Sequence, residues 1–235
     1  MLCKIADLIA EVPEAGDLVP RCREYLFNGN ASADIVIRTE QFNMDSRPLL
    51  SEQDRIYMQS GFRFNGNLLK YNGMMLHASA VVNEGKAYLF SGPCGMGKST
   101  HTKLWKQAFG NEVQIINDDK PALRCLNGVW YAYGTPWCGK DGINVNMKAP
   151  LAGICFLKQA PENKIRRLGE LEAAKKIISQ TIHKFWKADM LDLMLTNVDN
   201  LVCNIPIFEL ENCPEIEAAE LSYKTMRRAA EEIGL

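Results

Sequence analysis

The feature that most constrains this chain is the segment GPCGMGKS, residues 92–99, which lies between the apolar run KAYLFS and the segment KSTHTKLWKQAF. It fits the pattern G-x-x-x-x-G-K-[ST] at every fixed position. After it, Leu104, Trp105 and Phe109 recur at helical spacing, and Gly110 supplies a stop. The sequence therefore predicts a strand, a glycine-rich loop and a helix in direct succession.

Such a unit is suited to holding phosphate. Glycines let the backbone turn with its N–H groups pointing inward, and the first turn of the following helix adds unpaired N–H groups. Lys98 would bring a cation to the β- and γ-phosphates, and the Ser99 hydroxyl would be a ligand of Mg²⁺. We therefore expect ATP as a cofactor, cradled by Gly92, Pro93, Cys94, Gly95, Met96, Gly97, Lys98, Ser99 and Thr100. The alternative is a glycine-rich turn with a solvated lysine.

Two acids follow the next apolar strand, in the segment VQIINDDK. Ligands gather at the carboxyl ends of strands, so Asp118 and Asp119 should lie beside the phosphates if their strand neighbours the loop strand. One acid can hold Mg²⁺ while the other accepts the proton of an attacking hydroxyl, which favours a transferase over a hydrolase. We expect Asp118 and Ser99 to bind the metal and Asp119 to be the base, although the two acids can exchange roles. Alternatively, Asp118 caps a turn and Asp119 is a solvated neighbour of Lys120.

Two further candidates lie outside these motifs. His77 belongs to the β-rich run MMLHASAVV, and strand alternation lets it point either into the site or away from it. Lys140 belongs to the Gly- and Pro-containing segment YGTPWCGKDG, residues 133–142, and could add a second cation to a triphosphate, unless this segment is only a rigid turn. Trp137 in the same segment could stack on a base or pack the loop. Transition-state cations could come from Arg124, Arg166 and Arg167, which the sequence does not distinguish.

The remaining pattern predicts an α/β fold whose sheet is mixed, with hairpins and a P-loop. Residues 1–70 are expected to form a small N-terminal α+β lobe, and residues 71–235 the catalytic domain. Expected strands are DIVIRT (34–39), a hairpin with the three-residue turn NEG, a hairpin on Asn127-Gly128, APLAGICFLKQ and PIFEL. Expected helical stretches begin at Ser51 with glycine interruptions, span roughly 170–182 and 187–203, and end the chain from Pro214 to Ile233.

Composition excludes several classes of function. Lys plus Arg (27) nearly balance Asp plus Glu (28), so no net field favours nucleic acid or an anionic membrane. There is no run long enough for a membrane span, and acids interrupt the short apolar part of the N-terminus, so we expect a cytoplasmic protein. The eight cysteines are spread singly, which predicts reduced thiols and neither disulfides nor a zinc site.

The segments HASAVVNEGKAYLFSGPCGMGKST and INDDKPAL together resemble the catalytic domain of the HPr kinase/phosphorylase family. They are also similar to the nucleotide-binding core of the ATP-dependent phosphoenolpyruvate carboxykinases. The resemblance covers roughly residues 74–160 and implies a P-loop kinase with a mixed sheet. It places His77, Lys98, Ser99, Asp118 and Asp119 at positions that correspond to functional residues of the family, and it suggests a homo-oligomer.

The chain departs from that family in three places. Thr100 stands where bifunctional members carry an acid, GTPWCGK replaces their second signature segment, and the segment 1–70 does not resemble their N-terminal domain. These departures argue against HPr itself as the substrate. We therefore expect an ATP- and Mg²⁺-dependent kinase that phosphorylates a hydroxyl, foremost a serine of a protein or peptide. A regulatory module that binds ATP without transfer and a kinase of an amino acid or sugar remain as alternatives.

Overall fold

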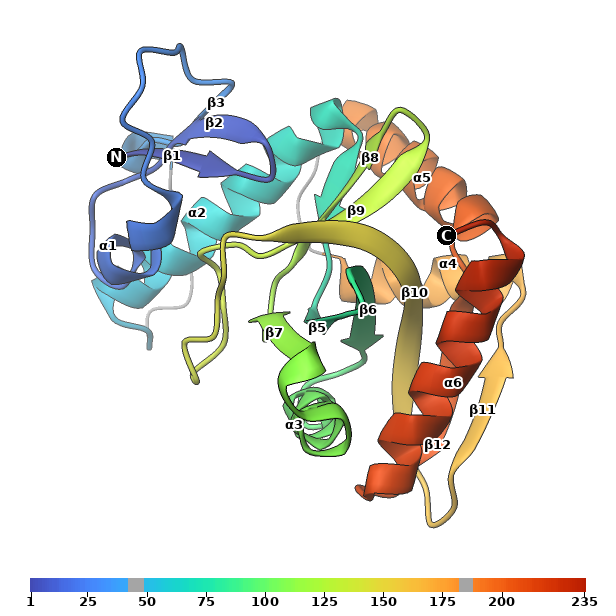
Figure 1. The fold of residues 1–235 in the computed structure, drawn as a ribbon. Coiled ribbons are helices and arrows are strands. Elements are labelled where there is room, and N and C mark those ends of the chain that lie inside the picture. The colour runs from blue at the N-terminus through green and yellow to red at the C-terminus, as the bar shows by residue number, and fades with distance from the viewer. Residues whose placement is uncertain (42–48, 182–187) are drawn as a thin grey trace.

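The computed structural model describes residues 1–41, 49–181 and 188–235. Figure 1 shows how its elements are arranged. The strands are β1 (Leu2–Ile5), β2 (Leu8–Glu11), β3 (Ile35–Val36), β4 (Gly73–Met75), β5 (Ala78–Asn83), β6 (Lys86–Ser91), β7 (Val113–Asn117), β8 (Ala122–Leu126), β9 (Val129–Tyr133), β10 (Lys148–Gln159), β11 (Lys164–Arg167) and β12 (Ile207–Asn212). The α-helices are α1 (Leu18–Arg21), α2 (Glu52–Leu68), α3 (Lys98–Phe109), α4 (Glu170–Gln180), α5 (Ala188–Asn204) and α6 (Ile216–Glu232). The short 3-10 helices are η1 (Arg23–Tyr25), η2 (Thr39–Gln41), η3 (Leu69–Tyr71) and η4 (Gly110–Glu112).

The main sheet is curled and mixed, in the order β4-β8-β9-β10-β6-β5-β7. Its longest strand, β10, joins the parts of the sheet, because its first residues pair with β9, its middle with β6 and its last with β12. β10 runs parallel to β6 and β12 but antiparallel to β9. Strand β11 extends the sheet beyond β12. The expectation of a mixed α/β fold with hairpins is therefore confirmed.

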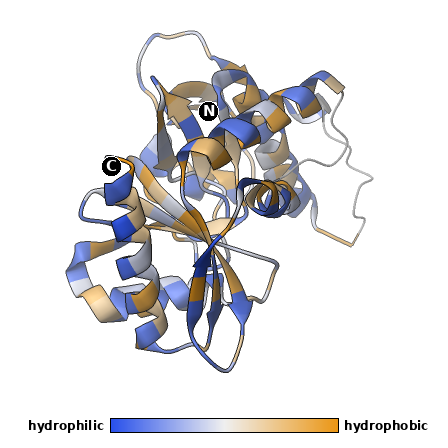
Figure 2. Ribbon diagram, turned by 90° about the vertical axis from the view of Figure 1, so that its right-hand side faces the viewer, coloured by the Kyte–Doolittle hydropathy of each residue, from blue (hydrophilic) through white to orange (hydrophobic). Residues whose placement is uncertain are grey.

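Helices cover both faces of this sheet, which explains why strand β6 is apolar along most of its length. Ala87 and Leu89 face the core that is closed by α4 and α5. Tyr88 and Phe90 alternate with them and face the core that contains residues of α3 and α6. A strand that is buried on both faces has no reason to alternate in polarity. In Figure 2 hydrophobic colour appears on strands in the middle of the molecule, whereas the helices carry mixed colours.

The end of β6, the start of β5 and the end of β7 lie together, on the side of the sheet where the carboxyl ends of β6 and β7 are. Antiparallel pairing sets Ala78, at the start of β5, opposite Ser91, at the end of β6. The next strand, β7, also pairs with β5 and ends at Asn117. The acid strand is therefore not the neighbour of the loop strand, because β5 lies between them. β6 and β7 nevertheless run in the same direction, since each is antiparallel to β5. The segments that follow them therefore leave the sheet on the same side, at the carboxyl ends of these two strands.

The N-terminal segment 1–70, where it is described, shares a core with the sheet. Strands β1 and β2 form a hairpin, to which β3 adds in parallel. Their apolar side chains pack in one cluster with Met75, Ala122, Tyr133 and Trp137 of the later segments. Helix α2 begins at the predicted cap, where the Ser51 hydroxyl accepts a hydrogen bond from the N–H of Asp54 at 3.1 Å. Its glycines do not break it.

Several predicted boundaries differ from the observed ones. In the segment 34–39 only two residues form a strand, and η2 begins at Thr39. The first hairpin turns on two residues and not three, because Glu84 and Gly85 both adopt positive φ (48° and 72°), which suits a tight turn. His77 precedes β5 instead of lying in it. Residues 182 and 187, at the predicted ends of two helical stretches, lie outside the described residues, and β4 and β11 were not predicted as separate strands.

Within the described ranges, no helix combines the length and apolar character that crossing a membrane requires. The eight cysteines are free thiols. Cys94 and Cys203 are exposed, Cys125 and Cys213 are half-buried, and the others are buried.

His101 predicts how stability depends on pH. It is fully buried on α3, where Nε2 lies 3.0 Å from the Ser222 hydroxyl and its ring packs on Phe90. Burial lowers the pKa of His101 to about 3. The unfolded chain takes up this proton below about pH 6.5, whereas the folded chain does not, so stability should fall as the pH drops from about 6.5 toward 3. His77, whose pKa is about 4, contributes in the same direction.

The test is the free energy of unfolding, measured against pH for the wild type and for His101→Gln, which keeps an N–H donor near the position of Nε2. Between pH 6 and 4 we expect the variant to lose stability more slowly, by about 1 kcal/mol per pH unit. Equal slopes for the two proteins would show that His101 is not the group responsible.

Candidate functional site

The loop of residues 92–97 joins β6 directly to α3, as the sequence predicts. Gly95 and Gly97 adopt positive φ values of 83° and 90°, in a region that side-chain-bearing residues rarely enter. A Cβ at either position would meet no atom within 4 Å, so the glycines are required by the backbone conformation and not by lack of space. Helix α3 begins at Lys98, and its first backbone bond runs from His101 N–H to the Gly97 carbonyl at 2.8 Å. The first N–H groups of this helix thus stand next to the loop.

Lys98 lies folded back over this loop. Its Nζ donates hydrogen bonds to the carbonyls of Gly92, at 2.9 Å, and Pro93, at 3.1 Å. Burial lowers the pKa of Lys98, and the negative charge of Asp119 opposes this shift. At the tip of the loop the Gln159 side chain, at the end of β10, donates to the Gly95 carbonyl at 3.2 Å. The loop therefore holds a buried cation and is tied to a second strand.

The buried side chain of Asn117 shapes the turn that carries the acids. Its Oδ1 accepts the N–H groups of Asp119, at 2.9 Å, and Lys120, at 2.7 Å. Its Nδ2 donates to the Thr135 carbonyl at 3.0 Å, on the segment that follows β9. One amide therefore fixes the turn after β7 and fastens it to the loop of residues 135–142.

Asp118 points toward that loop. Only 7% of the residue is exposed, and Oδ1 accepts the N–H of Gly139 at 2.6 Å. Burial raises the pKa of Asp118, although the Gly139 bond opposes this. Across the described ranges, no Lys or Arg forms an ion pair with Asp118. A buried carboxylate of this kind fits a Mg²⁺ ion, which binds proteins through one or two carboxylates and completes its shell with water and phosphate.

Asp119 faces a different environment from Asp118. Its Oδ1 lies 2.7 Å from Nζ of Lys120 and 3.3 Å from Nε2 of His77, and 31% of its side chain is exposed. The other ring nitrogen of His77, Nδ1, lies 3.1 Å from Oε1 of Gln180, the last residue of α4. Burial lowers the pKa of His77 to about 4, and the charges of Lys120 and Lys98 act in the same direction. The imidazole is therefore neutral near pH 7 and donates one N–H, either to Asp119 or to Gln180.

His77 is held in place by the backbone as well. Its N–H donates to the Gln180 carbonyl at 2.9 Å, and its carbonyl accepts the hydroxyl of Ser91, the last residue of β6, at 2.8 Å. The histidine thus lies between the end of the loop strand and Asp119. The sequence left the direction of the His77 side chain open, and in the structure its ring faces Asp119.

Other predicted residues are not drawn into this cluster. Thr100, Pro93, Cys94 and Lys140 are exposed at the surface, and Met96 and Ser99 are half-buried. Trp137 cannot stack on a base, because it is buried against Phe64 and donates Nε1–H to the Ser60 hydroxyl at 3.0 Å.

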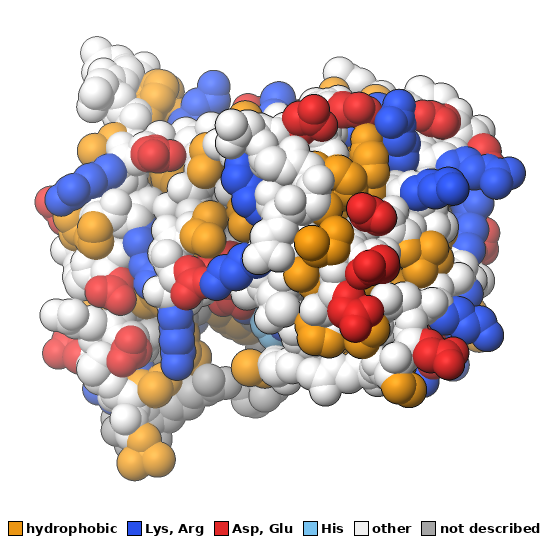
Figure 3. Space-filling view, turned by 60° about the horizontal axis from the view of Figure 1, so that its bottom comes forward, with side chains coloured by type: hydrophobic (Ala, Val, Ile, Leu, Met, Phe, Trp, Pro, Cys, Tyr) orange, Lys and Arg blue, Asp and Glu red, His pale blue; other side chains and the backbone are white. Residues whose placement is uncertain are grey.

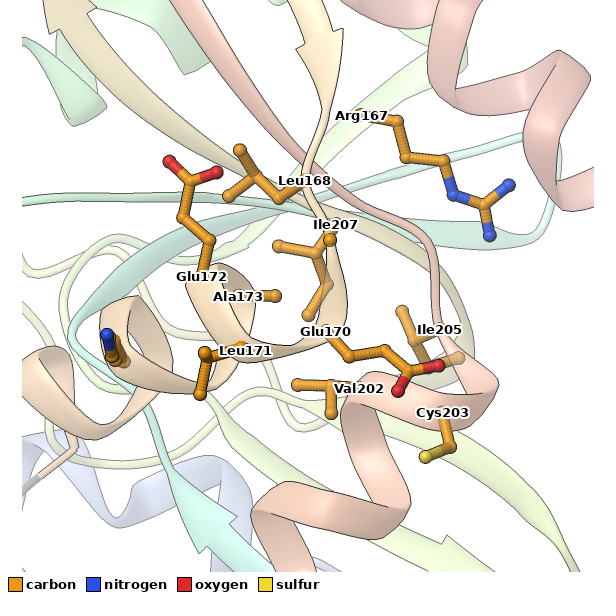
Figure 4. Close-up of a pocket in the computed structure, with 12 residues that line it drawn as sticks. Arg167, Leu168, Glu170, Leu171, Glu172, Ala173, Val202, Cys203, Ile205 and Ile207 are labelled. Atoms are coloured by element: carbon orange, nitrogen blue, oxygen red, sulfur yellow. The ribbon is translucent and has the colours of Figure 1, made fainter.

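The three candidate arginines lie elsewhere. Arg124 is buried and donates to the carbonyls of Ala6 and Tyr71. Arg166 forms ion pairs with Glu172 and Glu209. Arg167 lines a cavity of about 790 Å³ between the start of α4 and the end of α5 (Figure 4). None of the predicted site residues other than Arg167 lines that cavity.

Five residues lie in or beside the site although the sequence analysis did not predict them as site residues. These are Asn117, Lys120, Gln180, Arg21 and Tyr57. The first two lie beside Asp118 and Asp119, and an asparagine at the end of a strand before a turn is a signal that could have been used. The others come from distant segments, and no local pattern marks them. Figure 3 shows acidic and basic side chains around a hollow in which a histidine is visible.

Asn117→Ala should destabilise the protein and disturb the turn. The substitution leaves the N–H groups of Asp119 and Lys120 without their acceptor, and each unsatisfied group of this kind costs about 1–3 kcal/mol. We expect the free energy of unfolding to fall by about 3 kcal/mol in denaturant titrations. The matched control is Asn111→Ala in the exposed η4, for which we expect a change within about 0.5 kcal/mol. A similar, small effect at both positions would refute the anchoring role.

Comparison with solved structures finds similarity to the structure of the Hpr(Ser) kinase/phosphatase from Coxiella burnetii, at 13% sequence identity and a TM-score of 0.39. The match covers 68% of this chain and 92% of that one. Among curated proteins, none matches the chain in sequence.

Comparison with protein-family models gives a match over residues 62–213, to the family described as SynChlorMet cassette protein ScmC. The matched segment runs from within α2 to just after β12, so it includes the glycine loop, the acid turn and the loop of residues 135–142. Because this match spans more than half of the sequence, the chain belongs to the SynChlorMet cassette protein ScmC family.

Proposed function

We propose that this protein is an ATP- and Mg²⁺-dependent kinase that transfers the γ-phosphate to a hydroxyl group, with a serine of a protein or peptide as the expected acceptor. The proposal rests on one observation: the glycine loop and the acid turn both lie at the carboxyl ends of their strands, on the same side of the sheet. A glycine loop with a buried lysine follows β6, and a turn with two differently placed carboxylates follows β7. Phosphoryl transfer needs mainly positioning and charge stabilisation, which this arrangement supplies.

In this proposal the loop of residues 92–97 and the first turn of α3 bind the phosphates through backbone N–H groups. Lys98 leaves its loop carbonyls to meet the β- and γ-phosphates, where its charge offsets the charge that develops during transfer. Ser99, the second residue of α3, presents its hydroxyl at the same helix end. The residue types and backbone geometry of this segment fit a nucleotide polyphosphate.

Asp118 and Ser99 are the residues that would hold Mg²⁺. When bound, the ion would supply positive charge that offsets the negative charge of the phosphates. Asp118 suits this role because it is buried and its carboxylate is aimed by the Gly139 N–H. Its backbone carbonyl also accepts the Ser79 hydroxyl, at 3.1 Å, so both ends of the residue are held.

Asp119 suits the role of general base. Both of its side-chain contacts within the described residues use Oδ1, which leaves Oδ2 for an acceptor hydroxyl. Its greater exposure, compared with Asp118, lets an acceptor reach it. In this role His77 carries its proton on Nε2 and donates it to this carboxylate, which orients the carboxylate, and Lys120 offsets its charge. This division assigns the metal to Asp118 and the proton to Asp119.

The acceptor class rests on the resemblance of the motifs to the HPr kinase/phosphorylase family. Incubation with γ-labelled ATP and an extract of the source organism separates the acceptors. A labelled protein or peptide supports a serine kinase, and a labelled small molecule supports an amino acid or sugar kinase. ATP binding without any labelled product supports a regulatory module.

Lys98→Ala should weaken the binding of Mg²⁺-ATP. A charge-assisted hydrogen bond is worth about 1.5–3 kcal/mol, which corresponds to a loss of about ten- to a hundredfold in affinity. Calorimetric titration measures this, and the control is Lys70→Ala at an exposed position on η3. If Lys98→Ala and the wild type bind alike, the loop does not bind the nucleotide as proposed.

Asp119→Asn should separate binding from transfer. We expect ATP affinity to stay within a few-fold of wild type and the transfer rate to fall by about a hundredfold or more, since a general base is lost. The control is Asp141→Asn, an exposed acid of the neighbouring loop that pairs with Lys103, which should transfer at nearly the wild-type rate. An equal loss of binding and turnover in Asp119→Asn would contradict its role as base.

A further inference from the structure

The loop segment at Cys138 and Gly139 is hydrogen-bonded on both sides. The Cys138 carbonyl oxygen accepts Nη1–H of Arg21 at 2.7 Å and the Tyr57 hydroxyl at 2.8 Å. The N–H of the same peptide group, which belongs to Gly139, donates to Oδ1 of Asp118 at 2.6 Å. A single peptide plane therefore joins a guanidinium from α1 and a phenol from α2 to a carboxylate of the candidate site.

The guanidinium is itself fixed. Arg21 is the last residue of α1, and its Nη1 also lies 2.8 Å from the Tyr57 hydroxyl. The guanidinium stacks on the ring of Tyr57, with 4.7 Å from Cζ to the ring centroid. The Arg21 carbonyl accepts a hydrogen bond from the side-chain amide of Asn144, which follows the loop of residues 135–142, at 2.8 Å. The backbone of Arg21 is thus held by Asn144, and its guanidinium is held by Tyr57 and the Cys138 carbonyl.

Gly139 packs so closely against Asp118 that there is no room for a side chain at position 139. Its φ is not positive, so the backbone conformation does not require glycine. A Cβ there would lie 2.9 Å from Oδ2 of Asp118 and 3.1 Å from its Cγ. The glycine is required by the space that the carboxylate occupies.

We propose that Arg21 and Tyr57 are positioning residues, which fix the 138–139 peptide so that its N–H holds the Asp118 carboxylate in place. A cation and a hydroxyl at the carbonyl polarise the peptide and strengthen its N–H as a donor. What Asp118 does there rests on the proposed function, but its placement by this peptide does not. The N-terminal segment thereby completes the site without contributing a group that reacts.

The direct test is the NMR signal of the Gly139 amide in the absence of any ligand. In the wild type we expect a downfield amide proton with slow exchange, and Asp118→Ala should move it upfield. In Arg21→Met the signal should already be shifted and exchange about tenfold faster, so that adding Asp118→Ala changes it little. Tyr57→Phe, which removes one donor and keeps the ring, should give an intermediate shift. Arg23→Met, at an exposed position two residues on, should match the wild type.

A second readout connects positioning to the metal. Replacing a residue that orients a metal ligand typically costs about 10- to 100-fold in metal affinity. We expect Arg21→Met to weaken ATP binding in the presence of Mg²⁺ by about tenfold, while metal-free ATP binding stays within about twofold of wild type. Thermal melts check that each variant is folded, and Tyr57→Phe serves in place of Arg21→Met if the latter does not fold.

The outcomes separate the two proposals. If the wild type binds no nucleotide, the proposed function fails, yet the Gly139 signal still decides the positioning role. If Arg21→Met and Tyr57→Phe leave the Gly139 amide and its response to Asp118→Ala as in the wild type, Arg21 and Tyr57 do not position Asp118.

Discussion

The candidate site depends on the hydrogen bonds that the side chain of Asn117 forms. Its oxygen accepts two backbone N–H groups of the acid turn, and its nitrogen donates to the segment after β9. A buried amide satisfied in this way is costly to replace, since each partner would otherwise be left without a hydrogen bond. The same residue ends β7, so the sheet, the acid turn and the loop of residues 135–142 take their relative positions from it.

Local rules account for the elements that the sequence predicted well. Helix α3 follows its loop glycines and ends before Gly110, and the hairpin of β8 and β9 turns on Asn127 and Gly128, which both have positive φ. These features are determined within a short stretch of chain by backbone sterics and capping. The order of strands is not local. Nothing near the acid strand in sequence indicates that β5 lies between it and the loop strand, because the ladder that decides this joins distant positions such as Ala80 and Asn117.

The same limit applies to the site. Lys98 is recognisable from the glycine-rich motif that contains it, and Asp118 and Asp119 are recognisable as a pair of acids at the end of an apolar strand. Arg21 and Tyr57 reach the site through a carbonyl of Cys138, separated from them by 117 and 81 positions, and any residue can offer a carbonyl. Trp137 shows the converse limit. The sequence left open whether this tryptophan stacks on a base or packs its loop. The structure shows the packing role, because Gly61 of α2 leaves room for the ring and Trp137 lies in the core.

Strand β7 lies at the end of the sheet order, and this position has a consequence for dynamics. On its inner side it is held by the ladder to β5. On its outer side, among the described residues, its backbone pairs only with residues 144–145, through a bridge from Asn117 to Asn144 and a bond from Val145 to Ile116. Edge elements open with less free energy than the whole protein needs to unfold. Because both carboxylates follow this strand, the lifetime of the assembled acid turn is governed by the local opening of one edge, and not by the global stability of the fold.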